Sequence, residues 1–143
     1  GIAEFTGGGF LPVMTDREVK AADVKRVVFS SGKVYYDLLA ERKKRDDQST
    51  ALVRVEQFYP FPKQQLIDEL NRFASATDVV WVQEEPKNYG GWYFIEPRLL
   101  RILGANQRLR YAGRAASASP ATGSHTIHQM EQRQLVKDAF AEH

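Results

Sequence analysis

The sequence predicts an α/β fold, a mostly parallel open sheet with helices on its faces. Short runs rich in β-branched and aromatic residues alternate along the chain with longer segments whose apolar residues recur at helical spacing. Successive apolar runs are separated by connections as long as a helix, which favours parallel strands joined by right-handed crossovers. The length of 143 residues is that of one ordinary domain with one hydrophobic core.

Two strand–helix units account for the first half of this pattern. A β-rich run over 24–29 predicts the first strand, which ends at the turn 30–32. The next helix begins near Val34, and we interpret the charged run 41–47 as its end followed by a solvated loop. A second strand over 51–55 precedes another helix, for which Pro62 suits the first position. The apolar face of that helix consists of Leu66, Ile67, Leu70 and Phe73.

Two more strands and two helices are expected in the second half. The short apolar run 79–82 predicts a strand that is buried on both faces and ends within residues 83–86. A helix is expected over 92–103, although Pro97 must either start it late or kink it. The fourth strand is expected over 107–111, a turn-like segment over 113–124 and a last helix over 127–140. The clearest apolar face of this last helix is Leu135, Val136, Ala139 and Phe140.

The opening residues 1–22 differ in composition from the rest of the chain. They contain three consecutive glycines, a proline and scattered charges, which is typical of a linker. We expect a lead-in segment over 1–22 that packs on something else or is loosely held, and a compact domain over 23–143. Such a segment suggests that the chain was cut from something longer, although an ordinary ragged N-terminus explains it equally well.

Composition excludes several classes of protein. A count of 20 Lys and Arg against 18 Asp and Glu gives a net charge of +2, which is too balanced for a dedicated nucleic-acid-binding domain. The absence of cysteine excludes a disulfide scaffold, a thiolate metal site and a cysteine nucleophile. No apolar run approaches the roughly 20 residues of a membrane span, so we expect a soluble, intracellular domain.

Ser31, Gly32 and Lys33 are candidate residues for binding an anion. They follow a predicted strand and open a helix, and free backbone N–H groups at a helix N-terminus beside a lysine favour an anion. The segment is not a P-loop, because it lacks the upstream glycine and has Val34 where Ser or Thr is needed. In the alternative interpretation, Ser30 or Ser31 only caps the helix.

Two further groups of residues could carry chemistry but lack a complete set of partners. Glu84 and Glu85 lie where α/β sheets place ligands, but adjacent residues of an extended chain point to opposite sides and are poorly placed to share a proton. His125 and His128 could share a helix face, yet only Glu131 is near enough in sequence to join a metal set. We assign no catalytic and no metal-binding residue, and a small hydrolase using Glu84 and a histidine stays an open hypothesis.

The region from Pro97 to Met130 is basic. It holds five arginines and no Asp or Glu, and several Ser and Thr residues follow the last arginine. The arginines are Arg98, Arg101, Arg108, Arg110 and Arg114. Guanidinium groups pair well with carboxylate and phosphate, so a stand-alone α/β module that binds an acidic partner or an anion is another hypothesis. The alternative is a solvated face followed by a loop.

Four motifs resemble one protein family, and they occur in the order of that family. They are VKRVVFSSGKVYYDLL, VRVEQFYPFP, VVWVQEEPKNYGGW and LRYAGRAASASPATGSHTIH, the last followed by the closing EQRQLVKDAF. Together they closely resemble the C-terminal region of the thiamine diphosphate-dependent decarboxylating (first) component of the 2-oxoglutarate dehydrogenase complex. The resemblance covers nearly everything from Phe10 onward. One such motif is weak evidence, but four with matching spacing are highly specific.

The resemblance implies a structural and regulatory domain, similar to the C-terminal domain of transketolase, at the end of a larger subunit. Such a subunit binds thiamine diphosphate and magnesium through its preceding domains. It decarboxylates 2-oxoglutarate oxidatively and passes the succinyl group to a lipoyl carrier in the citric acid cycle. The implied partners are those preceding domains, a second copy in a homodimer and the lipoyl-carrying succinyltransferase, with no nucleic acid and no membrane. The implied compartment is the bacterial cytoplasm or the mitochondrial matrix, and this chain alone is expected to bind no cofactor and to be inactive.

The resemblance also implies a regulatory site. In the family that the chain resembles, some members bind nucleotide or acyl-coenzyme A effectors where this domain meets its neighbour. By position, Ser31, Gly32, Lys33 and Gln83 are the candidate effector-binding or anion-binding residues. They are expected at the carboxyl ends of the first and third strands, and a parallel sheet places such ends at one edge.

A domain separated from its partners is expected to expose apolar surface. Contiguous exposed apolar area above roughly a few hundred Å² is unusual on a genuine monomer. Phe10, Leu11 and Trp92 are the candidates for such a patch.

Overall fold

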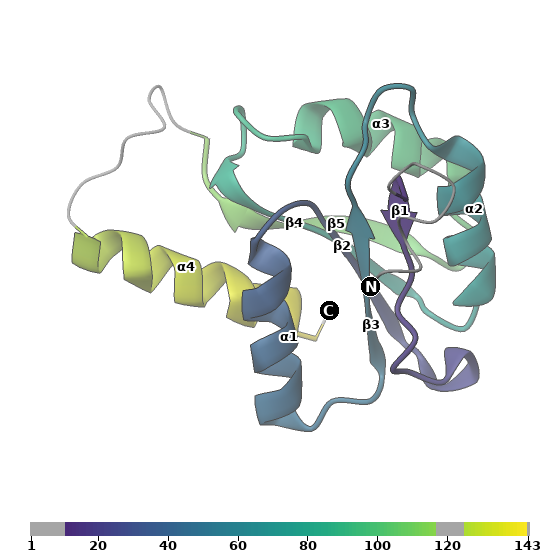
Figure 1. The fold of residues 1–143 in the computed structure, drawn as a ribbon, viewed down its shortest axis with the longest axis horizontal. Helices are drawn as coiled ribbons and strands as arrows, with labels where there is room; N and C mark the ends of the chain where they lie inside the picture. Colours follow the sequence, from purple (N-terminus) through teal and green to yellow (C-terminus); the bar gives the residue numbers. More distant parts are fainter. Residues whose placement is uncertain (1–10, 117–124, 143) are drawn as a thin grey trace.

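The computed structural model describes residues 11–116 and 125–142, and these residues contain one five-stranded sheet (Figure 1). Its strands are β1 (Val13–Met14), β2 (Arg26–Ser30), β3 (Thr50–Val55), β4 (Asp78–Pro86) and β5 (Arg108–Arg114), in the spatial order β1-β3-β2-β4-β5. The short edge strand β1 is antiparallel to β3, and all other neighbouring strands are parallel. The predicted α/β fold with a mostly parallel open sheet is confirmed.

Helices cover both faces of this sheet. A short 3-10 helix, η2 (Ala21–Asp23), precedes β2, and the α-helices are α1 (Val34–Arg45), α2 (Lys63–Arg72), α3 (Trp92–Ile102) and α4 (His125–Ala139). Helices α1 and α4 pack into a hydrophobic cluster on one face, and α2 and α3 pack into a second cluster on the other face (Figure 1). Within the described ranges, no helix is long and apolar enough to cross a membrane.

The central strands β2 and β4 are buried on both faces, because helices pack on each side of them. Val27 and Phe29 of β2 belong to the cluster with α2 and α3, whereas Val28 belongs to the cluster with α1 and α4. In β4, residues 79–82 are at most 1% exposed, which confirms the expectation of a strand buried on both faces. The core therefore fixes the two strands whose carboxyl ends form the candidate site.

Of three elements near the candidate site, two end where the sequence predicts and one extends further. Strand β4 ends at Pro86, within the segment from Gln83 to Pro86 in which the sequence predicts its end, and it pairs with β5 through an irregular register between these two residues. Strand β5 reaches Arg114, inside the segment predicted as a turn, and residues 117–124 of that segment lie outside the described residues. Helix α1 ends at Arg45, inside the charged run 41–47, as expected for a run that forms the end of a helix and the start of a loop.

Pro97 lies inside α3 without delaying its start. The helix begins at Trp92, so the alternative of a late start is wrong. Proline has no N–H to donate to the carbonyl of Tyr93 one turn earlier. Arg98 stabilises the same turn, because its Nη1 donates a hydrogen bond to the Phe94 carbonyl at 2.7 Å. Its guanidinium also lies 3.7 Å from the centre of the Phe94 ring.

The described part of the predicted lead-in segment packs on the sheet itself. Val13 and Met14 add β1 to the edge of β3, and Asp16 just beyond them is only 6% exposed. The Asp16 carboxylate accepts hydrogen bonds from the Arg42 guanidinium and, at 2.8 Å, from the Leu52 backbone N–H. Such additional hydrogen bonds offset part of the cost of desolvating a buried ion pair. The domain boundary between residues 22 and 23 stays a prediction.

At the amino ends of the strands, Asp78 joins two arginines. Its carboxylate accepts hydrogen bonds from Arg26 Nε and from Arg110 Nε, both at 2.8 Å. Burial disfavours the charged carboxylate, but these hydrogen bonds outweigh burial, so the pKa of Asp78 is lowered. Arg110 also donates to the carbonyls of Asp138 and Ala139 in the last turn of α4, where a cation complements the helix dipole. The charged groups at this edge of the sheet are therefore paired with one another.

Candidate functional site

The carboxyl ends of β2 and β4 form the crevice at which open α/β sheets place their ligands. The chain leaves β2 through α1 to β3 on one side of β2, and it returns through α2 to β4 on the other side. The loops after β2 and β4 therefore diverge, and a crevice opens between them. Ser31, Gly32 and Lys33 follow β2, and Gln83 lies near the end of β4. The structure thus brings the four predicted residues to the same edge of the sheet.

Three of these four residues line one cavity of about 400 Å³. Ser31 and Gly32 form the part of its wall that comes from β2, and Gln83 forms part of the wall that comes from β4. The cavity is otherwise largely aromatic, with Phe58 from the loop after β3 and Phe94 from α3 among its lining residues. Aromatic rings and polar groups therefore share the wall of this cavity.

Lys33 faces a second cavity instead. Its side chain is 83% exposed, and its Nζ lies 3.1 Å from Glu84 Oε1. Lys33 itself occupies the N-cap position of α1, so neither Ser30 nor Ser31 is the capping residue. Gly32 has a φ of 80°, a left-handed conformation that glycine adopts without strain. An anion bound here would have to compete with the Glu84 carboxylate for the Lys33 ammonium group.

The Gln83 side chain is 3% exposed, and its hydrogen bonds are made within the protein. Its Oε1 accepts hydrogen bonds from Trp81 Nε1 at 2.9 Å and from the Trp92 backbone N–H at 3.1 Å. Its Nε2 donates to the carbonyls of Glu85 at 3.2 Å and Pro86 at 3.0 Å. A primary amide has two N–H donors and two acceptor lone pairs. A ligand could therefore reach this amide only by displacing one of these four partners.

The Gln83 amide fixes the turn between β4 and α3. A helix N-terminus leaves backbone N–H groups without intrahelical partners, and the N-cap residue Gly91 has no side chain to satisfy them. Gln83 satisfies one of them, that of Trp92, from the preceding strand. A Cβ on Gly90 would lie 2.6 Å from the Gln83 side chain, and a Cβ on Gly91 would lie 2.8 Å from Phe58 Cζ. The two glycines therefore let the turn close over the amide and the aromatic wall.

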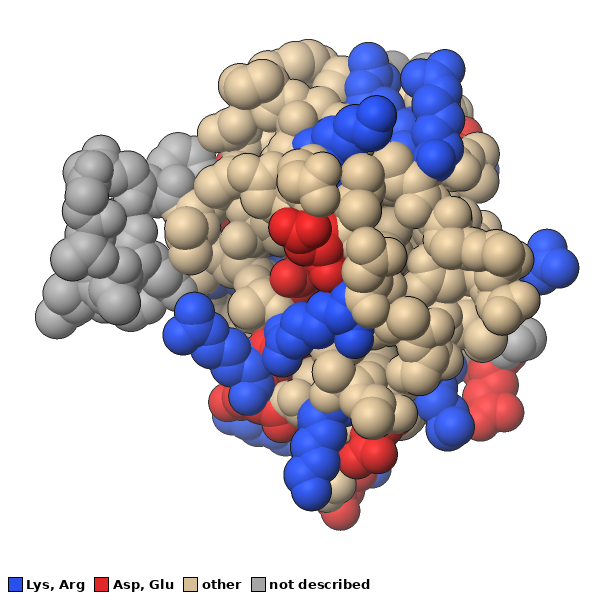
Figure 2. Space-filling model, turned by 90° about the vertical axis from the view of Figure 1, so that its right-hand side faces the viewer, with Lys and Arg blue, Asp and Glu red and all other residues tan. Residues whose placement is uncertain are grey.

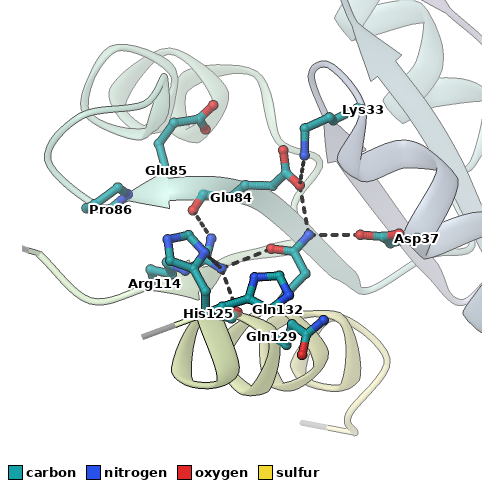
Figure 3. Close-up of a pocket in the computed structure, with 10 residues that line it drawn as sticks. Lys33, Asp37, Glu84, Glu85, Pro86, Arg114, His125, Gln129 and Gln132 are labelled. Carbon is teal, nitrogen blue, oxygen red and sulfur yellow. Dashed lines mark hydrogen bonds and ion pairs between the residues drawn. The ribbon is translucent and has the colours of Figure 1, made fainter. Parts of the chain in front are cut away.

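The second cavity, of about 420 Å³, has Arg114 in its wall (Figure 3). Arg114 is the last residue of β5 and is 7% exposed. Its guanidinium donates to the carbonyl of Glu84, to the carbonyl of His128 at 3.1 Å and to Gln132 Oε1 at 3.1 Å. Arg114 thus ties the first half of α4 to the end of β4, a role that its place in a basic stretch of sequence did not reveal.

Gln132 extends this network from α4 toward α1. Its Nε2 donates to Glu84 Oε1 and to Asp37 Oδ2, both at 2.8 Å. Figure 3 shows Glu84 and Glu85 pointing away from each other, as the sequence predicts for adjacent residues of an extended strand. The Glu84 carboxylate is held between Gln132 and Lys33, so its contacts are structural.

The two histidines lie at the exposed start of α4. His125 is the first residue of the helix and lines the second cavity, and His128 Nδ1 lies 3.3 Å from Arg114 Nη2. Among the residues that the structure describes, no group of three His, Asp or Glu side chains could hold a metal ion. In the same residues, the hydrogen bonds of Glu84 go to Lys33 and Gln132 rather than to a histidine. The geometry offers no support for a hydrolytic pair.

Trp92 is buried, so the expectation that it belongs to an exposed apolar patch is wrong. It is 4% exposed, and its ring lies 5.2 Å from the ring of Tyr111. Burial raises the pKa of Tyr111 to about 12, and the hydroxyl donates to the Arg114 carbonyl at 2.6 Å. Leu11 is 42% exposed, as expected, and Phe10 lies outside the described residues.

Comparisons with known proteins give one consistent result. A family model described as 2-oxoglutarate dehydrogenase C-terminal matches residues 1–140. The 2-oxoglutarate dehydrogenase E1 components of Cupriavidus necator, Haemophilus influenzae and Brucella anthropi are 44%, 45% and 52% identical to this chain over 141, 139 and 125 residues. These matches cover 98%, 96% and 85% of this chain, but only 15%, 15% and 12% of the length of the relatives.

Replacing Gln83 with leucine should destabilise the domain by about 2–4 kcal/mol, because the partners of its amide lose their hydrogen bonds. Gly90→Ala should act in the same direction, since the added Cβ displaces the same amide. Gln134→Leu, at an exposed glutamine of α4, is the control and should change the free energy of unfolding by less than about 0.5 kcal/mol. Denaturant unfolding measures all three, and equal stability of the Gln83 and Gln134 variants would contradict this role.

Proposed function

Because the chain belongs to the 2-oxoglutarate dehydrogenase C-terminal family, we propose that it is the C-terminal structural and regulatory domain of a larger first component of the 2-oxoglutarate dehydrogenase complex. The match of residues 1–140 to the family model carries this proposal, together with 44–52% identity to the E1 components. The chain spans 12–15% of the length of these relatives. The remainder of the proposed subunit precedes this domain.

The activity that we propose belongs to that whole subunit. It decarboxylates 2-oxoglutarate oxidatively and passes the succinyl group to a lipoyl carrier, with thiamine diphosphate and magnesium as cofactors. The described residues of this chain do not fit the metal, because no three carboxylate or imidazole groups converge in them. We therefore assign the cofactors to the preceding domains. A homodimer, the lipoyl-carrying succinyltransferase and the bacterial cytoplasm complete the proposal as partners and compartment.

The structure does not support the alternative of a stand-alone module that binds an acidic partner through its arginines. Arg110 is paired with Asp78, Arg114 is buried among carbonyl groups, and Arg98 lies against the ring of its own helix neighbour. On the face seen in Figure 2, acidic side chains lie directly beside basic ones, and the basic side chains do not form one continuous patch. These contacts favour the role of a domain within a larger subunit.

The 143-residue chain alone should show no turnover of 2-oxoglutarate with thiamine diphosphate, magnesium and an artificial electron acceptor. The reason is that the polar groups nearest its crevice are engaged in holding the fold. The full-length subunit that contains this sequence should be active in the same assay. Turnover by the isolated chain would contradict the proposal, and so would an inactive full-length subunit.

We also propose that Ser31, Gly32, Lys33 and Gln83 form the anion site of a regulatory ligand. The support is their position at the switch-point crevice, the exposed Lys33 ammonium and the neighbouring cavity of about 400 Å³. In this site the backbone N–H groups after β2 and the Lys33 side chain contact the anion. Gln83 does not contact the anion itself. It holds the wall of the cavity in place through its four hydrogen bonds.

Lys33→Ala in the full-length subunit should weaken the binding of a nucleotide or of acyl-coenzyme A by about tenfold, which is the effect of losing one charge-assisted contact. Lys44→Ala is the matched control, because Lys44 is an exposed lysine near the other end of the same helix. Calorimetric titration of both ligands against the wild-type and variant subunits measures the change. Unaltered affinity in Lys33→Ala would remove Lys33 from the site.

A further inference from the structure

Exposed aromatic side chains gather at the carboxyl edge of the sheet. Tyr36 lies in the first turn of α1 after β2, and Tyr59 lies in the loop after β3. Tyr89 and Tyr93 follow β4, the first in the turn before α3 and the second in its first helical turn. Their exposed fractions are 60%, 74%, 47% and 55% in chain order. We call these four tyrosines the aromatic edge.

The opposite edge of the sheet has a different character. Of the eight large apolar side chains exposed in the described ranges, none lies in the loops that directly precede β2, β3, β4 and β5. That edge carries instead the pairs of Asp78 with Arg26 and Arg110. Single exposed apolar residues are ordinary on a protein surface, whereas their accumulation at one edge marks an interaction site.

Tyr59 of the aromatic edge is connected to the hydrophobic core by a series of ring contacts. The ring centre of Tyr59 lies 4.7 Å from that of Phe94, which lies 6.1 Å from that of Phe58. Phe58 lies 6.0 Å from Trp81, a core residue that is 1% exposed. Between these rings opens the cavity of about 400 Å³ that Ser31 also lines. A firm, hollowed aromatic surface suits a packed protein contact, because each ring buries a large area.

The chain itself enters the domain at this edge. The Pro12 carbonyl accepts a hydrogen bond from the Glu56 backbone N–H at 2.8 Å, one residue beyond β3, and Leu11 before it is 42% exposed. The relatives are far longer than this chain, which spans 12–15% of their length. We propose that the aromatic edge, together with Leu11, docks on the preceding domains of the same polypeptide. This inference rests on the proposed function, and it names the surface that the contact uses.

Nitration of tyrosines in the full-length subunit tests this docking. The four tyrosines of the aromatic edge should react at least about tenfold more slowly in the native subunit than in the denatured one, because reaction then requires the interface to open. Mass spectrometry of the peptides gives a separate rate for each tyrosine. Reaction of Tyr59 and Tyr93 at the denatured rate would overturn the proposal.

A matched pair of variants on α3 provides a second readout. Tyr93 and Leu100 are both 55% exposed, but only Tyr93 belongs to the aromatic edge. Tyr93→Glu should loosen the contact and raise the nitration rate of Tyr59 several-fold in the full-length subunit. Leu100→Glu should leave that rate unchanged. Equal nitration of Tyr59 in the two variants would overturn the proposal even if both subunits are folded.

Two measurements, nitration at different protein concentrations and enzyme activity, distinguish docking within one polypeptide from contact with a second copy and from the proposed function. Protection by domains of the same polypeptide is independent of protein concentration. Protection that disappears on dilution would show that a second copy covers the aromatic edge, and it would overturn the assigned occupant. A full-length subunit with protected tyrosines but no turnover of 2-oxoglutarate would support the docking surface and count against the proposed function alone.

Discussion

The buried amide of Gln83 is the interaction on which the carboxyl edge of this domain depends. It joins a core indole, the irregular end of β4 and the first turn of α3 through four hydrogen bonds. A buried primary amide is costly unless its donors and acceptors are satisfied, and here they are. The loop after β3 and the two glycines before α3 pack against the same point, since neither Gly90 nor Gly91 has room for a side chain.

This constraint determines what the carboxyl edge can do. Gln83 lies on one face of the sheet and Arg114 on the other. Both side chains donate hydrogen bonds to backbone carbonyls of neighbouring segments of the chain. General acid–base catalysis needs groups within reach of a substrate proton, and the Glu84 carboxylate is instead held by Lys33 and Gln132. The same contacts make the edge firm and present its aromatic rings outward. These features suit a domain that supports and regulates a larger enzyme.

Much of the fold could be predicted from the sequence, because the spacing of apolar residues is visible locally. The same residues then pack together in the hydrophobic core, which stabilises the predicted strands and helices. Strand β1 was missed, since two residues in a glycine-rich segment show no alternation. The buried roles of Arg42 and Arg114 were missed as well. Local sequence around them indicates a solvated face, whereas their partners Asp16 and Glu84 lie 26 and 30 residues away. The position of Gln83 was predictable, but the use of its amide depends on a turn that only the tertiary structure closes.

Amide hydrogen exchange at Trp92 tests the central claim most directly. Its backbone N–H is in the first turn of α3, where intrahelical partners are absent, and in this structure it donates to Gln83 Oε1 at 3.1 Å. If the Gln83 amide holds the carboxyl edge together, this proton should exchange as slowly as those of β2 and β4, because it is released only when the core opens. Exchange as fast as that of an exposed loop would contradict the account.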